Sequence, residues 1–297
     1  MNLAAHLAGF LFAGVLLTAA QPANYQFHTF AVCEGCATAP AGINDEGIVG
    51  AALIAPNFFP VQGYVFNSKK NTVTAVPGAL WMTVPADNGI MPGAGFGPGG
   101  IVPVVLGKDG TAKTLEGYPG AGFTDILQFN KNGWSIGGAS LNFATWFSFL
   151  RSPDGSYTPL TYPGAVGNLT LGTFLLGWNE AGTMVGYLAD PTETQFAGLI
   201  RGPDGKWAVW NVPGATSTII YAITESGVMA GTYQDSSGWH GFVWGQGELR
   251  TVDFPGAANT TISGINNHGE LAGFTFTGAT PLITIPTAFV ATPDRQP

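Results

Sequence analysis

The sequence predicts an all-β protein, and three features of its composition support this fold class. Of the 297 residues, 44 are Gly and 21 are Pro, which interrupt helices and favour turns. Only 9% are charged, against about 25% in a typical soluble domain, so a mainly helical protein with charged solvent faces is excluded. Because 45% are hydrophobic and 12% aromatic, the chain is also too apolar to stay disordered.

The tripeptide Pro-Gly-Ala, preceded by an apolar or aromatic residue, divides the chain into repeating units. It begins at Pro77, Pro119, Pro163, Pro213 and Pro255, which gives spacings of 42, 44, 50 and 42 residues. An earlier unit, 44 residues before Pro77, begins at position 33, and the last unit runs to the chain end. Units therefore start near residues 33, 77, 119, 163, 213 and 255.

Each unit has the same internal layout, which is clearest in the fifth. Apolar and β-branched runs at 218–223, 228–233, 239–244 and 249–254 are separated by turns rich in Gly, Asn and Asp. The first turn recurs as Asn-x-x-Gly or a variant of it, where Asn bonds its own backbone and Gly takes a positive φ. The third turn recurs as Pro-Asp-Gly or Lys-Asp-Gly, a strong hairpin signal.

Four short strands in each unit of 42–50 residues indicate the blade of a β-propeller. The sequence therefore predicts a six-bladed β-propeller of four-stranded blades within one domain, residues 21–297. The last unit supplies only three strands, and residues 25–32 match a fourth strand. We expect this N-terminal strand to complete the last blade as three strands plus one, because closure removes two open sheet edges.

The first twenty residues have the features of a secretory signal peptide. Residues 2–20 are almost wholly apolar and end in Thr18-Ala19-Ala20, small residues suited to cleavage before Gln21. An uncleaved membrane anchor is the alternative interpretation. Cleavage predicts a secreted or periplasmic protein, expected to be a monomer with no membrane span in the mature chain. In such a compartment Cys33 and Cys36 are expected to form a disulfide.

The charge balance and the known motifs limit the partners that the chain can bind. The net charge is −8 and the ten basic residues are scattered, so no basic patch exists for nucleic acid. A zinc site at Cys33 and Cys36 would need two further ligands. The chain has no His-Glu-x-x-His and no phosphate-binding loop. The sequence therefore predicts no metal and no cofactor.

One stretch of the fifth unit and one of the sixth resemble a known repeat family. The fifth unit reads Ser-Gly-Trp-His-Gly-Phe-Val-Trp over 237–244, and Gly-Ile-Asn-x-x-Gly stands at the first turn of the sixth. These glycine-rich units resemble the bacterial extracellular repeats of the HAF family, named for His-Ala-Phe. Here Gly241 replaces the Ala, and the sixth unit has Thr287 in place of the His. The resemblance implies export and a propeller-like fold, and it implies no established activity.

Aromatic residues in the loops between second and third strands are the candidate binding surface. They are Phe58, Phe59, Phe96, Phe143, Trp146, Phe196 and Trp239. We expect these rings to gather at one rim of the propeller, beside the polar residues Asp190, Asp235 and His240. Aromatic faces with nearby polar groups suit sugars or apolar ligands. The alternative is that the rings cap the core between blades.

Candidate catalytic groups are few, and no catalytic residue is assigned. Paired carboxylates of a glycosidase could come from Asp190, Glu193 and Asp235 on the same rim. A Ser-His-Asp set of Ser236, His240 and Asp235 would be crowded into one loop. The sequence therefore predicts a secreted, non-catalytic binding propeller for a glycan, another extracellular polymer or a protein. A secreted polysaccharide hydrolase or lyase that uses the rim acids is the alternative.

Overall fold

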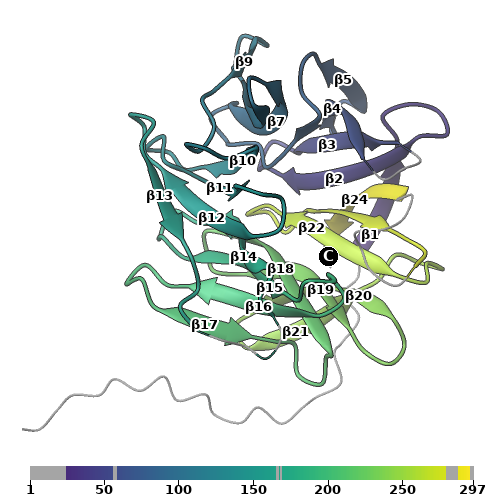
Figure 1. Ribbon diagram of the computed structural model, residues 1–297. Coiled ribbons are helices and arrows are strands. Elements are labelled where there is room, and N and C mark those ends of the chain that lie inside the picture. The colour runs from purple at the N-terminus through teal and green to yellow at the C-terminus, as the bar shows by residue number, and fades with distance from the viewer. Residues whose placement is uncertain (1–24, 56–58, 165–166, 168, 279–286, 295–297) are drawn as a thin grey trace, which may run out of the picture.

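The computed structural model describes residues 25–55, 59–164, 167, 169–278 and 287–294, and its regular elements there are β-strands. The strands form six antiparallel blades arranged as a ring (Figure 1). The prediction of an all-β, six-bladed propeller of four-stranded blades is thereby confirmed.

The first three blades follow one another along the chain. Blade 1 contains β2 (Ala37–Ile43), β3 (Ile48–Ile54), β4 (Pro60–Asn67) and β5 (Thr72–Val76). Blade 2 contains β6 (Trp81–Met82), β7 (Met91–Gly97), β8 (Gly100–Leu106) and β9 (Ala112–Thr114). Blade 3 contains β10 (Phe123–Phe129), β11 (Ser135–Ser140), β12 (Trp146–Arg151) and β13 (Tyr157–Leu160).

The remaining blades repeat this order, and the last one joins the two ends of the chain. Blade 4 contains β14 (Gly172–Trp178), β15 (Met184–Ala189), β16 (Phe196–Arg201) and β17 (Trp207–Trp210). Blade 5 contains β18 (Ser217–Ile223), β19 (Met229–Gln234), β20 (Trp239–Gly245) and β21 (Glu248–Val252). Blade 6 contains β22 (Thr260–Ile265), β23 (Leu271–Thr275), β24 (Thr287–Pro293) and, as its outer strand, β1 (Tyr25–Phe30).

The closure of blade 6 by β1 confirms the predicted three-plus-one arrangement. β1 pairs antiparallel with β24 at six consecutive positions, from Tyr25 opposite Pro293 to Phe30 opposite Ala288. The ring of Phe27 packs edge-on against Phe289 of the same blade, at a centroid distance of 5.2 Å. Just after β1, Cys33 and Cys36 form the predicted disulfide. The predicted signal segment, residues 1–20, lies outside the described residues.

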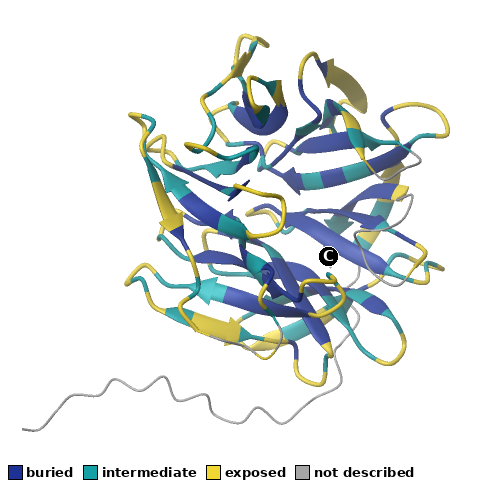
Figure 2. Cartoon of the chain, in the orientation of Figure 1, coloured by how far each residue is buried: buried dark blue, intermediate teal, exposed yellow. Residues whose placement is uncertain are grey.

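The hydrophobic core lies between neighbouring blades rather than at one centre. Phe30, Ala288 and Val290 of blade 6, for example, form one cluster with Val49 and Phe66 of blade 1. The inner strand β22 is buried along its whole length, whereas an outer strand such as β17 contains no buried residue (Figure 2). Blades covered on two faces have little surface for charged side chains, which accounts for the 9% charged content.

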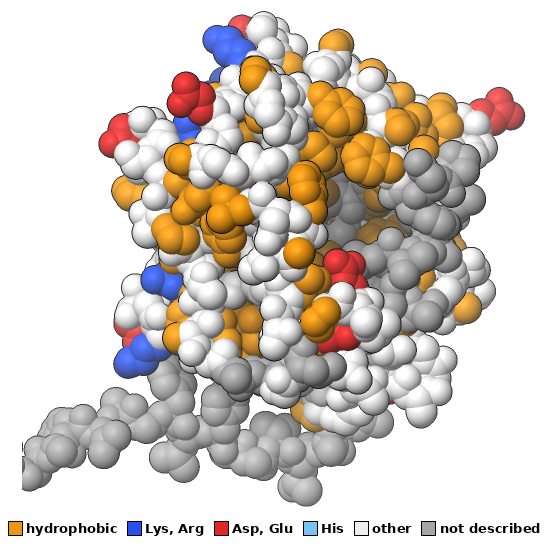
Figure 3. Space-filling model, viewed as in Figure 1, with side chains coloured by type: hydrophobic (Ala, Val, Ile, Leu, Met, Phe, Trp, Pro, Cys, Tyr) orange, Lys and Arg blue, Asp and Glu red, His pale blue; other side chains and the backbone are white. Residues whose placement is uncertain are grey.

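The surface in one view matches the scattered charge of the sequence. Hydrophobic side chains gather over the region of β10 to β13, and Lys and Arg side chains lie at the edge of that view (Figure 3). No helix in the described part of the chain is long and apolar enough to cross a membrane.

Asp125 is a buried carboxyl on the inner strand β10, and it makes the stability of the fold depend on pH. Burial raises its pKa to about 7, against the lowering effect of the Gly138 N–H, which donates to its carboxylate at 2.9 Å. A pKa raised in the folded state means that the fold favours the protonated acid. The stabilising effect is therefore complete below the ordinary pKa and is lost as the pH rises through about 7.

We predict that Asp125→Asn removes this dependence. An uncharged amide keeps an oxygen for the Gly138 N–H, so the variant should be more stable than wild type at pH 9 by roughly 4 kcal/mol. Near pH 4 the two proteins should have similar stability. Urea unfolding at both pH values measures the difference, and a variant whose stability falls with pH as steeply as wild type contradicts the prediction.

Candidate functional site

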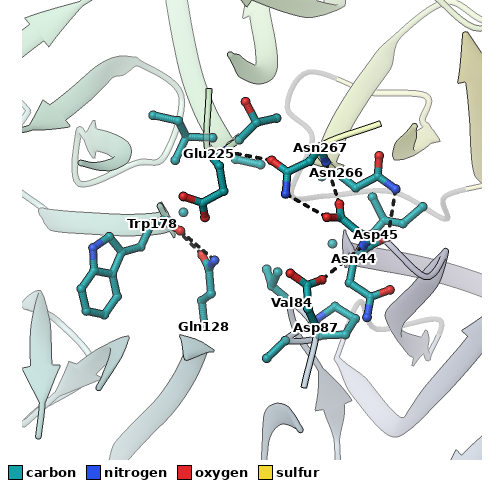
Figure 4. A pocket seen from close by; sticks show the side chains of 18 of the residues that line it. Asn44, Asp45, Val84, Asp87, Gln128, Trp178, Glu225, Asn266 and Asn267 are labelled. Atoms are coloured by element: carbon teal, nitrogen blue, oxygen red, sulfur yellow. Dashed lines mark hydrogen bonds between the residues drawn. The ribbon is translucent and has the colours of Figure 1, made fainter. Parts of the chain in front are cut away.

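The turns between the first and second strands of the six blades meet at the axis of the ring. All six have the same backbone, in which the N–H of a closing Gly bonds the first residue's carbonyl, as Gly47 does to Asn44 at 3.0 Å. The closing glycines have φ values from 74° to 89°, which an L side chain rarely adopts. Together these turns surround a cavity of about 500 Å³ (Figure 4).

The second residue of each turn takes part in a ring of hydrogen bonds around the cavity. These residues are Asp45, Asp87, Lys131, Glu180, Glu225 and Asn267. The backbone N–H of one blade donates to the side chain of the next: Asn267 to Asp45 at 2.8 Å, and Glu225 to Asn267 at 2.9 Å. Glu180 donates to Glu225 at 3.0 Å, and Lys131 to Glu180 at 2.6 Å. A longer bond of 3.4 Å joins the N–H of Asp45 to Asp87.

Lys131 breaks this ring between blades 2 and 3. Its ammonium has no lone pair and cannot accept the N–H of Asp87. The Lys131 Nζ lies instead 3.8 Å from Glu180 Oε2, with 71% of its side chain exposed. The ring of hydrogen bonds is therefore incomplete between blades 2 and 3, and it constrains the side chains of Asp87 and Lys131 least.

Further amide bonds between blades hold the walls of the cavity. Asn266 Nδ2 donates to the carbonyl of Asn44 at 2.9 Å. Gln128 and Trp178 exchange two bonds, one from Gln128 Nε2 to the Trp178 carbonyl at 2.7 Å and one from the Trp178 N–H to Gln128 Oε1 at 2.8 Å. Figure 4 shows both pairs beside the open space. These contacts fix the positions of the lining groups before any ligand arrives.

The ring residues give the cavity a net negative charge, because they contribute four carboxylates and one ammonium. Burial raises the pKa of Asp87, as do the negative charges of Asp45, Glu46 and Glu180, while the N–H of Asp45 lowers it. The lining thus offers hydrogen-bond acceptors beside apolar side chains such as Val84, Pro85 and Ile223. No group of three or more His, Cys, Asp or Glu side chains within the described ranges is arranged to hold a metal ion.

Sequence reasoning did not locate this cavity, because it assigned the binding surface to the other end of the strands. First and second strands are antiparallel in every blade, so the turn after the first and the loop after the second lie at opposite ends. The feature of the sequence that could have located the cavity is the acid or amide at the second turn position of five of the six blades.

The structure divides the predicted rim aromatics into exposed and buried sets. Phe59, Phe96 and Phe143 are 41%, 68% and 60% exposed. Phe196 and Trp239 are only 3% and 2% exposed and pack together in the core between blades 4 and 5, with ring centroids 5.9 Å apart. Phe196 and Trp239 thus take the alternative role, in which the rings cap the core. Phe58 lies outside the described residues.

A chain of ring contacts continues along this rim. Trp146 is partly buried and meets Phe123 at a centroid distance of 4.8 Å. Phe174 stacks on Tyr187 at 4.7 Å with an interplanar angle of 6°, and Tyr187 meets Phe196 at 5.6 Å. The rim is therefore a packed aromatic layer that leaves only some of its rings open to a ligand.

The rim acids have different environments. Burial alone would raise the pKa of Asp190, but hydrogen bonds from the Thr192 hydroxyl and from backbone N–H groups, those of Thr194 and Gln195 at 2.7 Å, lower it to about 2. Asp190 thus holds the β15–β16 loop as a carboxylate. Glu193 lies in the same loop and has a φ of 54°. Burial raises the pKa of its carboxyl. The Ser237 hydroxyl holds the pKa of Asp235 below its usual range.

His240 lies in this region too, between two loops of blade 5. Its Nε2 is 2.8 Å from Ser237 Oγ, and its Nδ1 is 2.8 Å from Asp253 Oδ2. Asp253 was not among the predicted site residues. The register that places Val252 opposite Gly241 brings it beside the histidine.

The ring of six blades and its axial cavity define the class of protein, a six-bladed β-propeller. No family model and no curated protein matches the sequence, so the resemblance to HAF repeats remains a prediction.

Solved structures resemble the chain over about nine-tenths of its length. A luciferin-regenerating enzyme matches with 12% identity and a TM-score of 0.54, covering 92% of this chain and 96% of that one. A catalytically inactive virginiamycin B lyase from Staphylococcus aureus, with quinupristin, matches with 10% identity and a TM-score of 0.53, covering 91% and 99%. A streptogramin B lyase matches with 12% identity and a TM-score of 0.51, covering 90% and 97%. At this identity the likeness establishes the fold alone.

Proposed function

We propose that the protein is a binding propeller of the cell exterior whose axial cavity holds part of a glycan or a similar polyhydroxylated polymer without cleaving it. The observation that carries the proposal is the convergence of one turn from each blade on a cavity of about 500 Å³. Its carboxylates and amides accept hydrogen bonds from hydroxyl groups, and its apolar walls suit the carbon face of a sugar ring. The location outside the cell rests on the predicted signal segment.

Binding is favoured over catalysis because the acids have structural partners. Asp45 and Glu225 accept backbone N–H groups from neighbouring blades. Asp190, one of the acids of the alternative hydrolase or lyase, is fixed by three backbone N–H groups. A general acid needs a pKa near the working pH, whereas that of Asp190 is lowered to about 2.

The test is an array of extracellular oligosaccharides and polysaccharides, followed by calorimetry with the best-bound sugar. Asp87→Ala removes a carboxylate that, among the described residues, accepts only the long bond from Asp45, so the fold should survive and affinity should fall at least tenfold. Phe143→Ala is the matched control on the opposite rim. Its ring is 60% exposed, so the fold should survive, and it does not line the cavity, so affinity should be unchanged.

Each other outcome contradicts part of the proposal. Loss of binding in Phe143→Ala moves the site to the aromatic rim. Absence of binding to every sugar on the array overturns the ligand class, and release of shorter products during incubation overturns the non-catalytic role of the cavity. Trp239→Ala is unsuitable as a rim variant, since truncating a Trp that is 2% exposed costs about 3–5 kcal/mol of stability.

A further inference from the structure

A serine, a histidine and an aspartate of blade 5 form a hydrogen-bonded series away from the axial cavity. Ser237 precedes β20, His240 is its second residue, and Asp253 follows β21. Ser237 Oγ lies 2.8 Å from His240 Nε2, and His240 Nδ1 lies 2.8 Å from Asp253 Oδ2. None of the three lines the cavity.

Each ring nitrogen of His240 faces the partner that nucleophilic catalysis requires, Nε2 the serine and Nδ1 the aspartate. In a Ser-His-Asp triad Nε2 takes the serine proton, while the aspartate at Nδ1 fixes the tautomer and stabilises the imidazolium. Asp253 is itself held, because its Oδ1 accepts the N–H of Gly241 at 3.3 Å. The side chain of His240 is 19% exposed and that of Asp253 is 40% exposed, so a substrate can approach from solvent.

Two acceptors lie within reach of the single hydroxyl proton of Ser237. Asp235 Oδ1 is 2.6 Å from Ser237 Oγ and 3.3 Å from His240 Nε2. If the hydroxyl donates to Asp235, His240 serves only as a structural clamp between the carboxylates of Asp235 and Asp253. If it donates to His240, Ser237 is activated. The two arrangements differ in whether this serine reacts with electrophiles.

We propose that Ser237 is an activated nucleophile toward small, unhindered carboxylic esters, with His240 as its base and Asp253 as the residue that orients the base. Ser237 Oγ bonds to the ester carbonyl carbon, its proton passes to His240 Nε2, and the alkoxide leaves with that proton as an alcohol. Water then attacks the acyl-serine and gives a proton to His240. The carboxylic acid departs, and the proton returns to the Ser237 oxygen.

The amide that follows the nucleophile is available for the developing oxyanion. Within the described residues the N–H of Gly238 donates no hydrogen bond. The N–H of the residue after the serine contributes to the oxyanion hole in other serine hydrolases. Gly238 has a φ of 145°, and a Cβ there would lie 3.2 Å from both the Ala258 carbonyl and Asn259 Oδ1, so the position favours glycine.

The experiment uses a fluorophosphonate probe on the folded protein, with mass spectrometry to locate the adduct, and p-nitrophenyl acetate to measure turnover. We expect labelling of Ser237, its loss in Ser237→Ala, and a decrease of at least 100-fold in the labelling rate in Asp253→Asn. Ser236→Ala is the matched control, because it removes the neighbouring hydroxyl and should label like wild type. Circular dichroism confirms that each variant is folded.

Two outcomes overturn the proposal. A wild-type protein that takes no label and hydrolyses the ester no faster than Ser237→Ala has the clamp arrangement instead. Equal labelling in Ser237→Ala places the reactive group elsewhere. Sugar binding at the axial cavity is independent of both, since no residue of this cluster contacts the cavity.

Discussion

A chain that begins at Ala31 is expected to lose its native fold. The deletion removes β1, which supplies the outer strand of blade 6 and pairs with β24 at six positions. It also removes Phe27, which packs against Phe254 at 5.3 Å and Phe289 at 5.2 Å between ring centroids. Phe30, stacked at 4.0 Å on Phe66 of blade 1, is lost with it.

The size of the expected effect follows from these contacts. Loss of a buried Phe costs about 3–5 kcal/mol, and whole domains are stable by only 5–15 kcal/mol. Losing the buried ring of Phe30, the partly buried ring of Phe27 and a strand ladder therefore removes most of the stability, and it leaves β24 as an open edge that invites aggregation. Closure between the two chain ends is what this prediction tests.

The measurement is thermal unfolding followed by circular dichroism, together with gel filtration. A chain that begins at Tyr25 is the control, because it keeps every β1 pairing and should unfold like the full chain. Cooperative unfolding of the Ala31 chain at an unchanged temperature contradicts the prediction. It would mean that three strands suffice for blade 6.

The strand order and the closure were accessible from sequence because their signals are local. The Asn-x-x-Gly turns, the Asp-Gly hairpins and the β-branched runs each specify a few residues of backbone. Their repetition then determines the number of blades, and the missing fourth strand of the last unit indicates where the N-terminal strand pairs. The disulfide of Cys33 and Cys36 needed only proximity along the chain.

The candidate site was less accessible, because it depends on which end of the blade faces the axis and on which side chains are buried. Trp239 and Phe143 are both expected in loops between second and third strands. In the structure Trp239 begins β20 and packs in the core, whereas Phe143 lies in the loop before β12 and is exposed. Blades are covered on both faces, so alternation along a strand does not distinguish them. Asp253 was missed because only strand register brings it to His240.

The glycine content also depends on packing that the local sequence does not reveal, because the turns account for only part of it. Five second strands carry a Gly where a Cβ would meet a carbonyl oxygen of the inner strand within 2.3 Å. These are Gly93, Gly137, Gly186, Gly231 and Gly273. In four of these blades the inner strand has a register shift beside the residue that pairs with the Gly, as between Leu175 and Gly177 in blade 4. Side-chain bulk is excluded at these five positions by close approach of two backbones.

Gly186→Ala is accordingly expected to destabilise the protein by about 4–5 kcal/mol, at the upper end of single substitutions. The added Cβ would lie 1.8 Å from the carbonyl oxygen of Phe174 and 2.8 Å from the Cα of Leu175. Both atoms are backbone in the inner strand β14, so no side chain can rotate away. Relief requires moving β14, which is paired with β15 along its length.

Gly256→Ala is the matched control, and it separates steric exclusion from backbone conformation. Gly256 belongs to a Pro-Gly-Ala turn with a φ of 78°, and a Cβ there would meet nothing within 4 Å. Its substitution should therefore cost only the penalty of the left-handed region, about 1–2 kcal/mol. Urea unfolding of both variants measures the difference. Equal losses would show that the second-strand glycines are required for their flexibility, whereas the distances predict that Gly186→Ala loses at least twice as much stability.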